Sequence, residues 1–261
     1  MLPHARRLQP HEVDLSELDH HHEIAVIEIE PRSACELDCA HCDSKARRRL
    51  ISIGLRRKPV HQVLDPSFAT EVLRALANHE KVLASAVITI AGSGEPLASQ
   101  HTPAIAAAAR KAFPNSKLQL FTSGWGIESQ QQMAERTPRE LNTLWFSADR
   151  FHVDSIRRAL KKSGQPSKPA DAENYLTDRL AWANKYAHDH GVTFVVRAII
   201  GRKSQYLYVA NLVSKAREKS GVTDEIQISE AGMHPPASRL KERKDGLIYL
   251  RSDGRVTGTL E

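Results

Sequence analysis

The stretch that decides the fold reads Ile24-Ala-Val-Ile-Glu-Ile29, then Glu-Pro-Arg-Ser-Ala, then Cys35-Glu-Leu-Asp-Cys39-Ala-His-Cys42. Its first part alternates apolar residues in the way that is typical of a buried β-strand. Its second part holds all three cysteines of the chain within eight residues. Cysteine thiolates bind soft metals and iron–sulfur clusters, and a cubane cluster takes four protein ligands. Three thiolates on one loop would therefore leave one iron open to a small molecule.

Two other interpretations of the cysteine loop stay open. One is a structural zinc site of the Cys3His type that uses His41, and the other is three unrelated buried cysteines. Zinc sites favour Cys-x2-Cys pairs that are separated by a longer stretch of chain. We therefore rank zinc below the iron–sulfur cluster, and chance clustering lower still.

The spacing Cys-x3-Cys-x2-Cys directly after a first strand resembles the radical S-adenosylmethionine (radical SAM) superfamily. The resemblance implies that Cys35, Cys39 and Cys42 hold a catalytic [4Fe-4S] cluster as its metal ligands. It also implies that S-adenosyl-L-methionine (SAM) chelates the fourth iron through its amino and carboxylate groups. His41 occupies a position that is usually aromatic in this family, and we assign it to the cofactor site.

A second motif follows the predicted strand 86–91 and reads Gly92-Ser93-Gly94-Glu95-Pro96. A dinucleotide fingerprint would continue to a third glycine, and this segment does not. It resembles instead the Gly-Gly-Glu-Pro motif of radical SAM enzymes, with Ser93 in place of the first glycine. The resemblance implies that the segment contacts the SAM amino group, while a plain turn is the structural alternative. Glycines allow close approach of a ligand, and a carboxylate accepts hydrogen bonds from an ammonium group.

Further polar candidates follow the next two predicted strands. Thr122-Ser123-Gly124 comes after strand 117–121 and resembles the Thr-Asn-Gly that this family often carries there. Ser147 and Asp149 come after strand 143–146, where polar residues of the family commonly bind the ribose hydroxyls of SAM. The alternative for Ser147 and Asp149 is turn chemistry and capping of the next helix.

Arg197 stands inside the predicted strand 192–200, which is otherwise almost entirely apolar. An arginine in a buried strand is costly unless it is paired. The SAM carboxylate would be a suitable bidentate partner. The alternative is that Arg197 points outward, to a helix carboxylate or to a rim.

Six predicted strands alternate with helices, which predicts an α/β fold with parallel strands and right-handed crossovers. Six units are two short of a (β/α)8 barrel, and the resemblance implies a partial (β/α)6 TIM-like barrel. We expect an N-terminal extension over 1–23, the radical SAM partial-barrel domain over 24–235 and a C-terminal β-hairpin and tail over 236–261. Because active sites of such barrels gather at the carboxyl ends of the strands, the candidates above should meet at one rim.

The composition limits the number of domains, the cellular compartment and the kind of partner that we expect. The chain has 261 residues, 41% hydrophobic and 26% charged, which is enough for one large domain or two small ones. The clustered cysteines give no disulfide framework, so we expect a cytoplasmic protein. Residues 1–23 lack the apolar core of a signal peptide, and no apolar run is long enough to span a membrane. A net charge of +6 favours an acidic partner.

Two polar stretches have no assigned role. Seven cations between positions 45 and 58 could attract a phosphate or an acidic segment, or form a solvated face. They are not interleaved with aromatic residues, so nucleic-acid binding is a minority interpretation. The run His20-His21-His22 could bind a metal, although a solvated surface stretch fits it better.

The resemblance implies reductive cleavage of SAM to a 5′-deoxyadenosyl radical, which abstracts a hydrogen atom from a peptide or small-metabolite substrate. The electron would come from a flavodoxin- or ferredoxin-like reductant. The core is most similar to peptide-modifying maturases but lacks cysteines for an auxiliary cluster. The alternatives are a glycyl-radical-enzyme activating protein, a non-catalytic iron–sulfur electron-transfer protein and a zinc-stabilised nucleic-acid-binding module.

Overall fold

The computed structural model describes residue 15 and residues 23–39, 42, 62–231, 246–251 and 256–257. Four features of the sequence lie outside these residues: His41, the histidine run 20–22, the basic stretch 45–58 and the turn 252–254.

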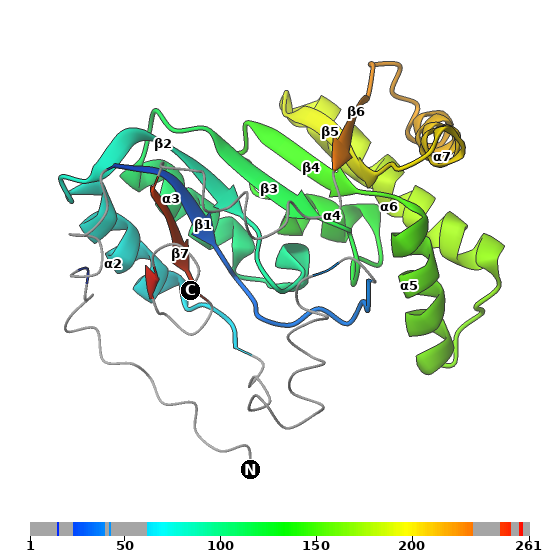
Figure 1. Cartoon of the computed structure of the whole chain (residues 1–261), viewed down its shortest axis with the longest axis horizontal. Helices are drawn as coiled ribbons and strands as arrows, with labels where there is room; N and C mark the ends of the chain where they lie inside the picture. The colour runs from blue at the N-terminus through cyan, green and yellow to red at the C-terminus, as the bar shows by residue number, and fades with distance from the viewer. Residues whose placement is uncertain are drawn as a thin grey trace, which may run out of the picture.

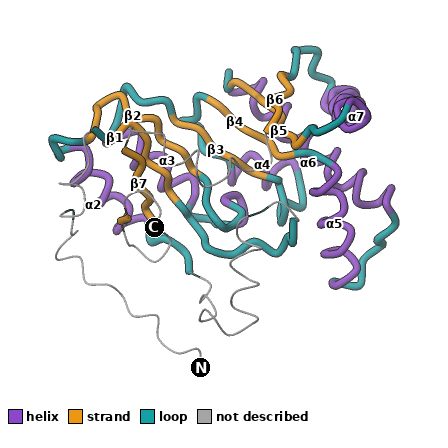
Figure 2. The backbone as a smooth tube through the Cα atoms, in the orientation of Figure 1, coloured by secondary structure: helices purple, strands orange, loops and turns teal. Residues whose placement is uncertain are grey.

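One sheet organises the molecule, with strands in the order β6-β5-β4-β3-β2-β1-β7-β8. Every neighbouring pair is parallel except β7 and β8, which are antiparallel. Figure 2 shows the strands stepping across the molecule from β7 and β1 to β5 and β6. Within the described residues the sheet is open, with β6 and β8 at its edges. The predicted α/β fold, with the parallel, unclosed sheet of a partial TIM-like barrel, is confirmed. The strand bounds are β1 Ile24–Ile29, β2 Val82–Ile90, β3 Leu118–Thr122, β4 Thr143–Ser147, β5 Thr193–Ile199, β6 Gln227–Ala231, β7 Gly246–Leu250 and β8 Val256–Thr257.

Helices connect the consecutive parallel strands from β1 to β6, and Figure 1 shows how they are arranged around the sheet. Two of them, α5 and α6, lie between β4 and β5. No helix in the described ranges is long and apolar enough to cross a lipid bilayer. The bounds are α2 Pro66–Ala77, η2 Pro96–Ala98, α3 Thr102–Ala112, α4 Gln130–Arg136, α5 Arg150–Lys162, α6 Pro169–His190 and α7 Lys203–Ser220.

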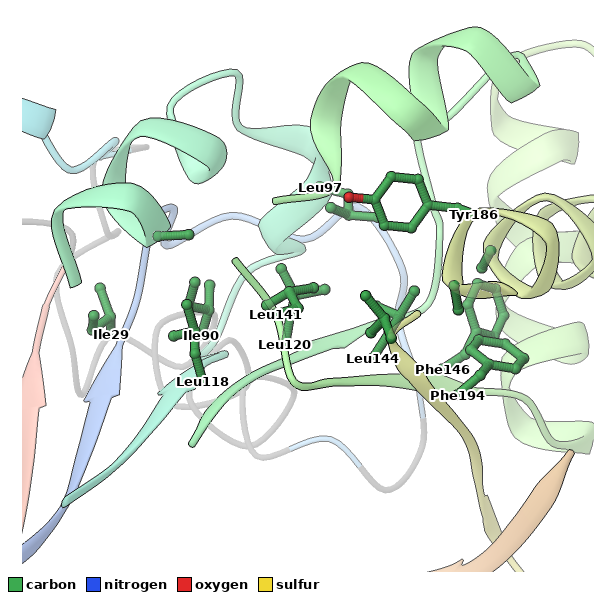
Figure 3. Packing of buried hydrophobic residues seen from close by; sticks show 14 of the residues in the cluster. Ile29, Ile90, Leu97, Leu118, Leu120, Leu141, Leu144, Phe146, Tyr186 and Phe194 are labelled. Atoms are coloured by element: carbon green, nitrogen blue, oxygen red, sulfur yellow. The ribbon is translucent and has the colours of Figure 1, made fainter. Parts of the chain in front are cut away.

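The hydrophobic core fills the space between the sheet and the helices. Strand residues such as Ile29, Ile90 and Leu144 are fully buried and point toward the helices in Figure 3. Phe146 of β4 and Phe194 of β5 extend this core, with ring centroids 6.4 Å apart. Burying one such side chain stabilises the fold by about 1.5–3 kcal/mol. The strand ends that carry polar residues are thus held by a rigid scaffold.

Helix α6 shows how far the local sequence predicts a helix end, since the sequence predicts Asp171 as its N-cap and Gly191 as its stop. Gly191 does end α6, in the left-handed conformation with φ of +64°. The N-cap prediction is wrong, because the helix begins earlier, at Pro169, and Lys168 occupies the cap position. The Asp171 carboxylate instead accepts a hydrogen bond of 2.7 Å from the Lys168 backbone amide. Proline suits the first helical turn, where its missing N–H costs nothing, and this explains the earlier start.

The predicted C-terminal hairpin is present as β7 and β8. β7 lies parallel to β1, with Ile248 beside Ile27, so the hairpin extends the central sheet. The sequence predicts the sixth strand over 225–229, but β6 runs two residues further, to Ala231, and therefore includes Glu230. Glu230 pairs with Ala198 of β5, which keeps its backbone in the sheet.

Candidate functional site

Most of the predicted site residues lie at the carboxyl ends of β1 to β4. The cysteine loop (residues 30–42) follows β1, and the Gly92–Pro96 segment follows β2. Thr122 and Ser147 are the last residues of β3 and β4, and Asp149 comes two residues after Ser147. Arg197 differs because it lies inside β5, beside Ser147. Since neighbouring strands are parallel, these ends share one edge of the sheet, which we call the rim.

The Gly92–Pro96 segment packs directly against the backbone of the cysteine loop. A Cβ atom on Gly94 would lie 2.0 Å from the carbonyl oxygen of Arg32, so only glycine fits there. The next amide, that of Glu95, donates a hydrogen bond of 3.1 Å to the carbonyl of Ala34. The two motifs singled out in the sequence are thus in backbone contact immediately before Cys35.

Glu30 anchors the other end of the same segment. It is 5% exposed, follows β1 directly and accepts a hydrogen bond of 2.7 Å from the Ser93 amide through Oε1. Gly92 adopts a φ of +117°, and a Cβ atom there would lie 2.7 Å from Glu30 Cγ. Glu30 was not among the predicted site residues, although its position directly after a strand is the signal that identified the other candidates.

Glu95 is an enclosed carboxylate of the rim, with 3% of its surface exposed. Oε1 accepts hydrogen bonds from the Thr122 hydroxyl at 2.5 Å and the Leu97 amide at 3.1 Å. Oε2 accepts from the Ser123 hydroxyl at 2.7 Å and the Ser123 amide at 2.9 Å. Burial raises the pKa of Glu95, and these four donors counteract that rise. Glu95 therefore ties the ends of β2 and β3 together.

None of the three cysteines forms a disulfide; Cys39 is buried, while Cys35 and Cys42 are partly buried. Burial, followed by the charge of Glu95, raises the pKa of Cys35. Burial also raises the pKa of Cys39 to about 12. Each of the three sulfurs lies within electrostatic reach of the other two. The raised pKa values keep the Cys35 and Cys39 thiols protonated in the metal-free chain, so metal binding must displace these protons.

These residues fit an iron–sulfur cluster. The three cysteines, none of which is in a disulfide, are the residue type whose thiolates ligate such clusters. Among the described residues, no three His, Cys, Asp or Glu side chains are placed to hold a single metal ion. His41, the proposed cofactor contact, is outside the described part of the chain.

Asp149 caps helix α5 and is only 2% exposed. Its Oδ1 accepts from the His152 amide at 3.0 Å and lies 2.9 Å from Nδ1 of the His152 ring. Its Oδ2 accepts from the Ile199 amide at 3.2 Å, just where β5 ends. The capping role weighed against ribose binding is therefore present through Oδ1, while Oδ2 bonds to the end of β5. Ribose binding by Asp149 stays a prediction.

Arg197 is solvent-exposed and lies in the strand next to the Asp149 cap, within electrostatic reach of the Asp149 carboxylate. Its guanidinium carbon is 5.3 Å from the centroid of the Phe121 ring, and Phe121 stacks on Trp145 at 5.3 Å and 5°. Desolvation lowers the pKa of Arg197, while the charges of Asp149 and Glu28 oppose that change. Arg197 thus presents a charge on the rim next to Ser147, which is half-buried. Contact between Arg197 and a SAM carboxylate stays a prediction.

A small cavity of about 120 Å³ opens beside the Asp149 cap. Arg150, Gln205 and Tyr208 contribute to its walls. The Tyr208 hydroxyl donates to Glu173 at 2.9 Å, so this wall is fixed by helix α6. The cavity extends the rim toward the beginning of α7.

Helix α5 contacts the cysteine loop through Ser155 and Arg158, neither of which was among the predicted site residues. The Ser155 hydroxyl is hydrogen-bonded to the Cys39 side chain. Arg158 donates to the carbonyl oxygen of Asp38 at 2.7 Å through Nη2. No local pattern marks these residues, because the partners are separated by more than one hundred positions.

Comparisons with known proteins assign neither a family nor an activity to this chain. No family model matches the sequence, and no curated protein matches it. Among solved structures, BtrN in complex with AdoMet and 2-DOIA aligns at 16% identity and a TM-score of 0.34, covering 49% of this chain and 46% of BtrN. Selenomethionine BtrN in an open conformation aligns at 16% identity and a TM-score of 0.34, covering 48% of this chain and 50% of BtrN. A likeness of this size, over about half of the BtrN chain, says nothing of activity.

Proposed function

We propose that this chain is a radical SAM enzyme that acts on a peptide or small-metabolite substrate. Cys35, Cys39 and Cys42 would hold its single [4Fe-4S] cluster, and an acidic flavodoxin- or ferredoxin-like protein would supply the electron. When bound and reduced, such a cluster splits SAM into methionine and a 5′-deoxyadenosyl radical, which abstracts a hydrogen atom from the substrate.

The contact between Gly94 and the backbone of Arg32 and Ala34 is the observation that carries this proposal. The cysteine spacing is typical of radical SAM enzymes, and Gly92–Pro96 resembles their Gly-Gly-Glu-Pro motif with Ser93 in place of the first glycine. The two segments are nevertheless about sixty residues apart in the sequence. In the fold they meet with no room for a Cβ atom, and Glu95 lies within electrostatic reach of Cys35. A ligand held by the cysteine loop would therefore face the Gly92–Pro96 segment.

Each rim residue has a defined task in this proposal. Glu95 is held in place by four donors and sets a negative charge beside the cysteine loop, which favours the SAM ammonium group. Arg197 offers an exposed guanidinium for the SAM carboxylate. The partly exposed side chains of Ser93 and Ser147 would line the site. The bond from the Ile199 amide to Asp149 would hold the end of β4 beside β5.

Anaerobic reconstitution tests the proposal. The purified chain is treated with iron and sulfide, reduced with dithionite and studied by electron paramagnetic resonance with and without SAM. We expect about four irons per chain and a reduced-cluster signal that changes when SAM binds. A chain that takes up zinc but no iron and sulfide would contradict the proposal, as would a cluster whose signal is indifferent to SAM.

A further inference from the structure

We propose that Ser155 and Arg158 of helix α5 form a hydrogen-bond relay that raises the reduction potential of the cluster through Cys39. This inference rests on the proposed function, since it requires the cluster. Neither residue is a cluster ligand, and neither is one of the proposed SAM contacts. They are positioning residues that act on the electron-accepting step.

The geometry of the relay is compact. One guanidinium nitrogen of Arg158, Nη2, lies 2.7 Å from the Asp38 carbonyl oxygen and 2.9 Å from Ser155 Oγ. Asp38 is the residue immediately before Cys39, so Arg158 holds the loop backbone at the point where the ligand emerges. Ser155 is 1% exposed and Cys39 is 6% exposed, so the contact between them is shielded from water.

The hydrogens of the relay can be placed one by one. A guanidinium has only donors, so Ser155 Oγ must accept from Arg158. A serine hydroxyl has one hydrogen, which is then directed to its other partner, the Cys39 sulfur. A cysteine that ligates iron is a thiolate and has no hydrogen to give. The direction Arg158 to Ser155 to Cys39 is therefore the one that satisfies every group once the cluster is bound.

The effect on the potential follows from charge. Reduction adds one electron to the cluster and its thiolates, and hydrogen bonds to the sulfurs and nearby net charge set the potential. A hydrogen bond to Cys39 and a cation behind it both stabilise the more negative, reduced state. The negative charge of Asp149 near Cys39 acts in the opposite direction on the potential. Its carboxylate already accepts hydrogen bonds from the His152 and Ile199 amides. Loss of the relay should therefore make the cluster harder to reduce.

A redox titration of the reconstituted protein, followed by electron paramagnetic resonance without SAM, tests this. For Ser155→Ala we expect the ratio of reduced to oxidised cluster at a fixed potential to fall about tenfold, which for one electron is about 59 mV. Ser155→Thr keeps the hydroxyl and should restore the wild-type ratio. Arg158→Gln removes the charge and should lower the ratio as well. Because Arg158 is on the surface, its variant decides the matter if Ser155→Ala does not take up the cluster.

Two matched controls isolate the relay. Arg157→Gln removes the neighbouring exposed arginine of the same helix, and Ser116→Ala removes a buried serine that donates to Ala84 at 3.2 Å. Both should titrate like the wild type. If Ser155→Ala and Arg158→Gln also titrate like the wild type while SAM cleavage persists, the relay is wrong and the proposed function stands. A wild-type chain that assembles no cluster would overturn both.

Discussion

The two ends of the rim are built differently. At the β1–β3 end, the cysteine loop and the Gly92–Pro96 segment meet through backbone, and Glu95 is enclosed by four donors. At the β4–β5 end, Arg197 is exposed and rests on an aromatic ring, and the buried group there, Asp149, serves helix α5. Substitutions at the first end would disturb the backbone packing, whereas substitutions of the exposed side chains at the second end would leave the fold intact. We therefore expect mutations at the first end to affect the fold and the cofactor together, and those at Arg197 to affect binding alone.

The largest effect should come from Gly94→Ala. The new methyl group would lie 2.0 Å from the Arg32 carbonyl, so one of the two backbones must move. We expect a loss of about 3 kcal/mol in the free energy of unfolding, at the upper end for overpacking, together with loss of the cluster. Denaturant unfolding of the metal-free chain and iron analysis of the reconstituted chain measure the two effects.

Gly201→Ala is the matched control for this variant. A Cβ atom there meets only the flexible end of Gln205, at 3.4 Å. Its stability should stay within about 0.5 kcal/mol of the wild type. Equal effects of the two substitutions would mean that the loops are not in the tight contact described here.

Glu95→Gln should have the next largest effect. A glutamine side chain has one acceptor oxygen, so its NH2 group would face donors that the carboxylate now satisfies. Leaving buried donors unpaired costs about 2 kcal/mol in the free energy of unfolding. Denaturant unfolding measures it, with the exposed Glu80→Gln as a control that should change little.

The same variant should alter the pH dependence of stability. Because the pKa of Glu95 is raised in the fold, the native chain binds more protons than the unfolded chain above pH 4.5. Glu95 thus makes wild-type stability fall as pH rises from 4.5 to its folded-state pKa. Glu95→Gln should show a shallower fall over this window, and identical slopes would mean that Glu95 is ionised at its ordinary pKa.

Asp149→Ala should destabilise the fold by about 1.5 kcal/mol, through loss of the α5 cap and of the bond to the Ile199 amide. The exposed cap of helix α2, Asp65, gives a comparison, since its carboxylate accepts from Ser67 and Phe68. Asp65→Ala should cost about 1 kcal/mol in the same unfolding experiment. A larger loss at Asp65 than at Asp149 would contradict the view that Asp149 also joins β4 to β5.

Arg197→Gln should have the smallest effect on the fold, within about 0.5 kcal/mol, because its side chain is exposed. Its effect should appear in SAM affinity, which we expect to weaken about tenfold through loss of a charge-assisted pair. Equilibrium binding of SAM to the reconstituted protein measures this. Arg202→Gln, an exposed arginine five residues further on, should bind SAM like the wild type, and equal affinities in all three proteins would remove Arg197 from the site.

Local patterns predicted the strands and the helices well, and also the place of Gly92–Pro96 directly after β2, because each depends on neighbours in the sequence. The alternating run at Ile24–Ile29 and the glycine after His190 are examples in which the residues themselves dictate the local structure. The start of α6 was missed because Asp171 suits a cap position, while Pro169 three residues earlier suits the first turn equally well.

Long-range contacts could not be predicted from the sequence. Three of the four donors to Glu95 come from Thr122 and Ser123, 27 and 28 residues away, and only the fold brings them together. The bond from Arg158 to Asp38 spans 120 residues and joins two segments that share no pattern. For Asp149 the sequence allowed both capping and ribose binding, and only the coordinates assign its oxygens to specific donors.

The measurement that tests the central claim most directly is 5′-deoxyadenosine formation by the reconstituted, dithionite-reduced chain supplied with SAM. The account predicts 5′-deoxyadenosine and methionine from the wild type, and none above background from the triple variant Cys35→Ala, Cys39→Ala, Cys42→Ala. The Gly94→Ala variant should also fall to background, because it separates the two motifs. A wild type that forms no 5′-deoxyadenosine, or a triple variant that still forms it, would contradict the account.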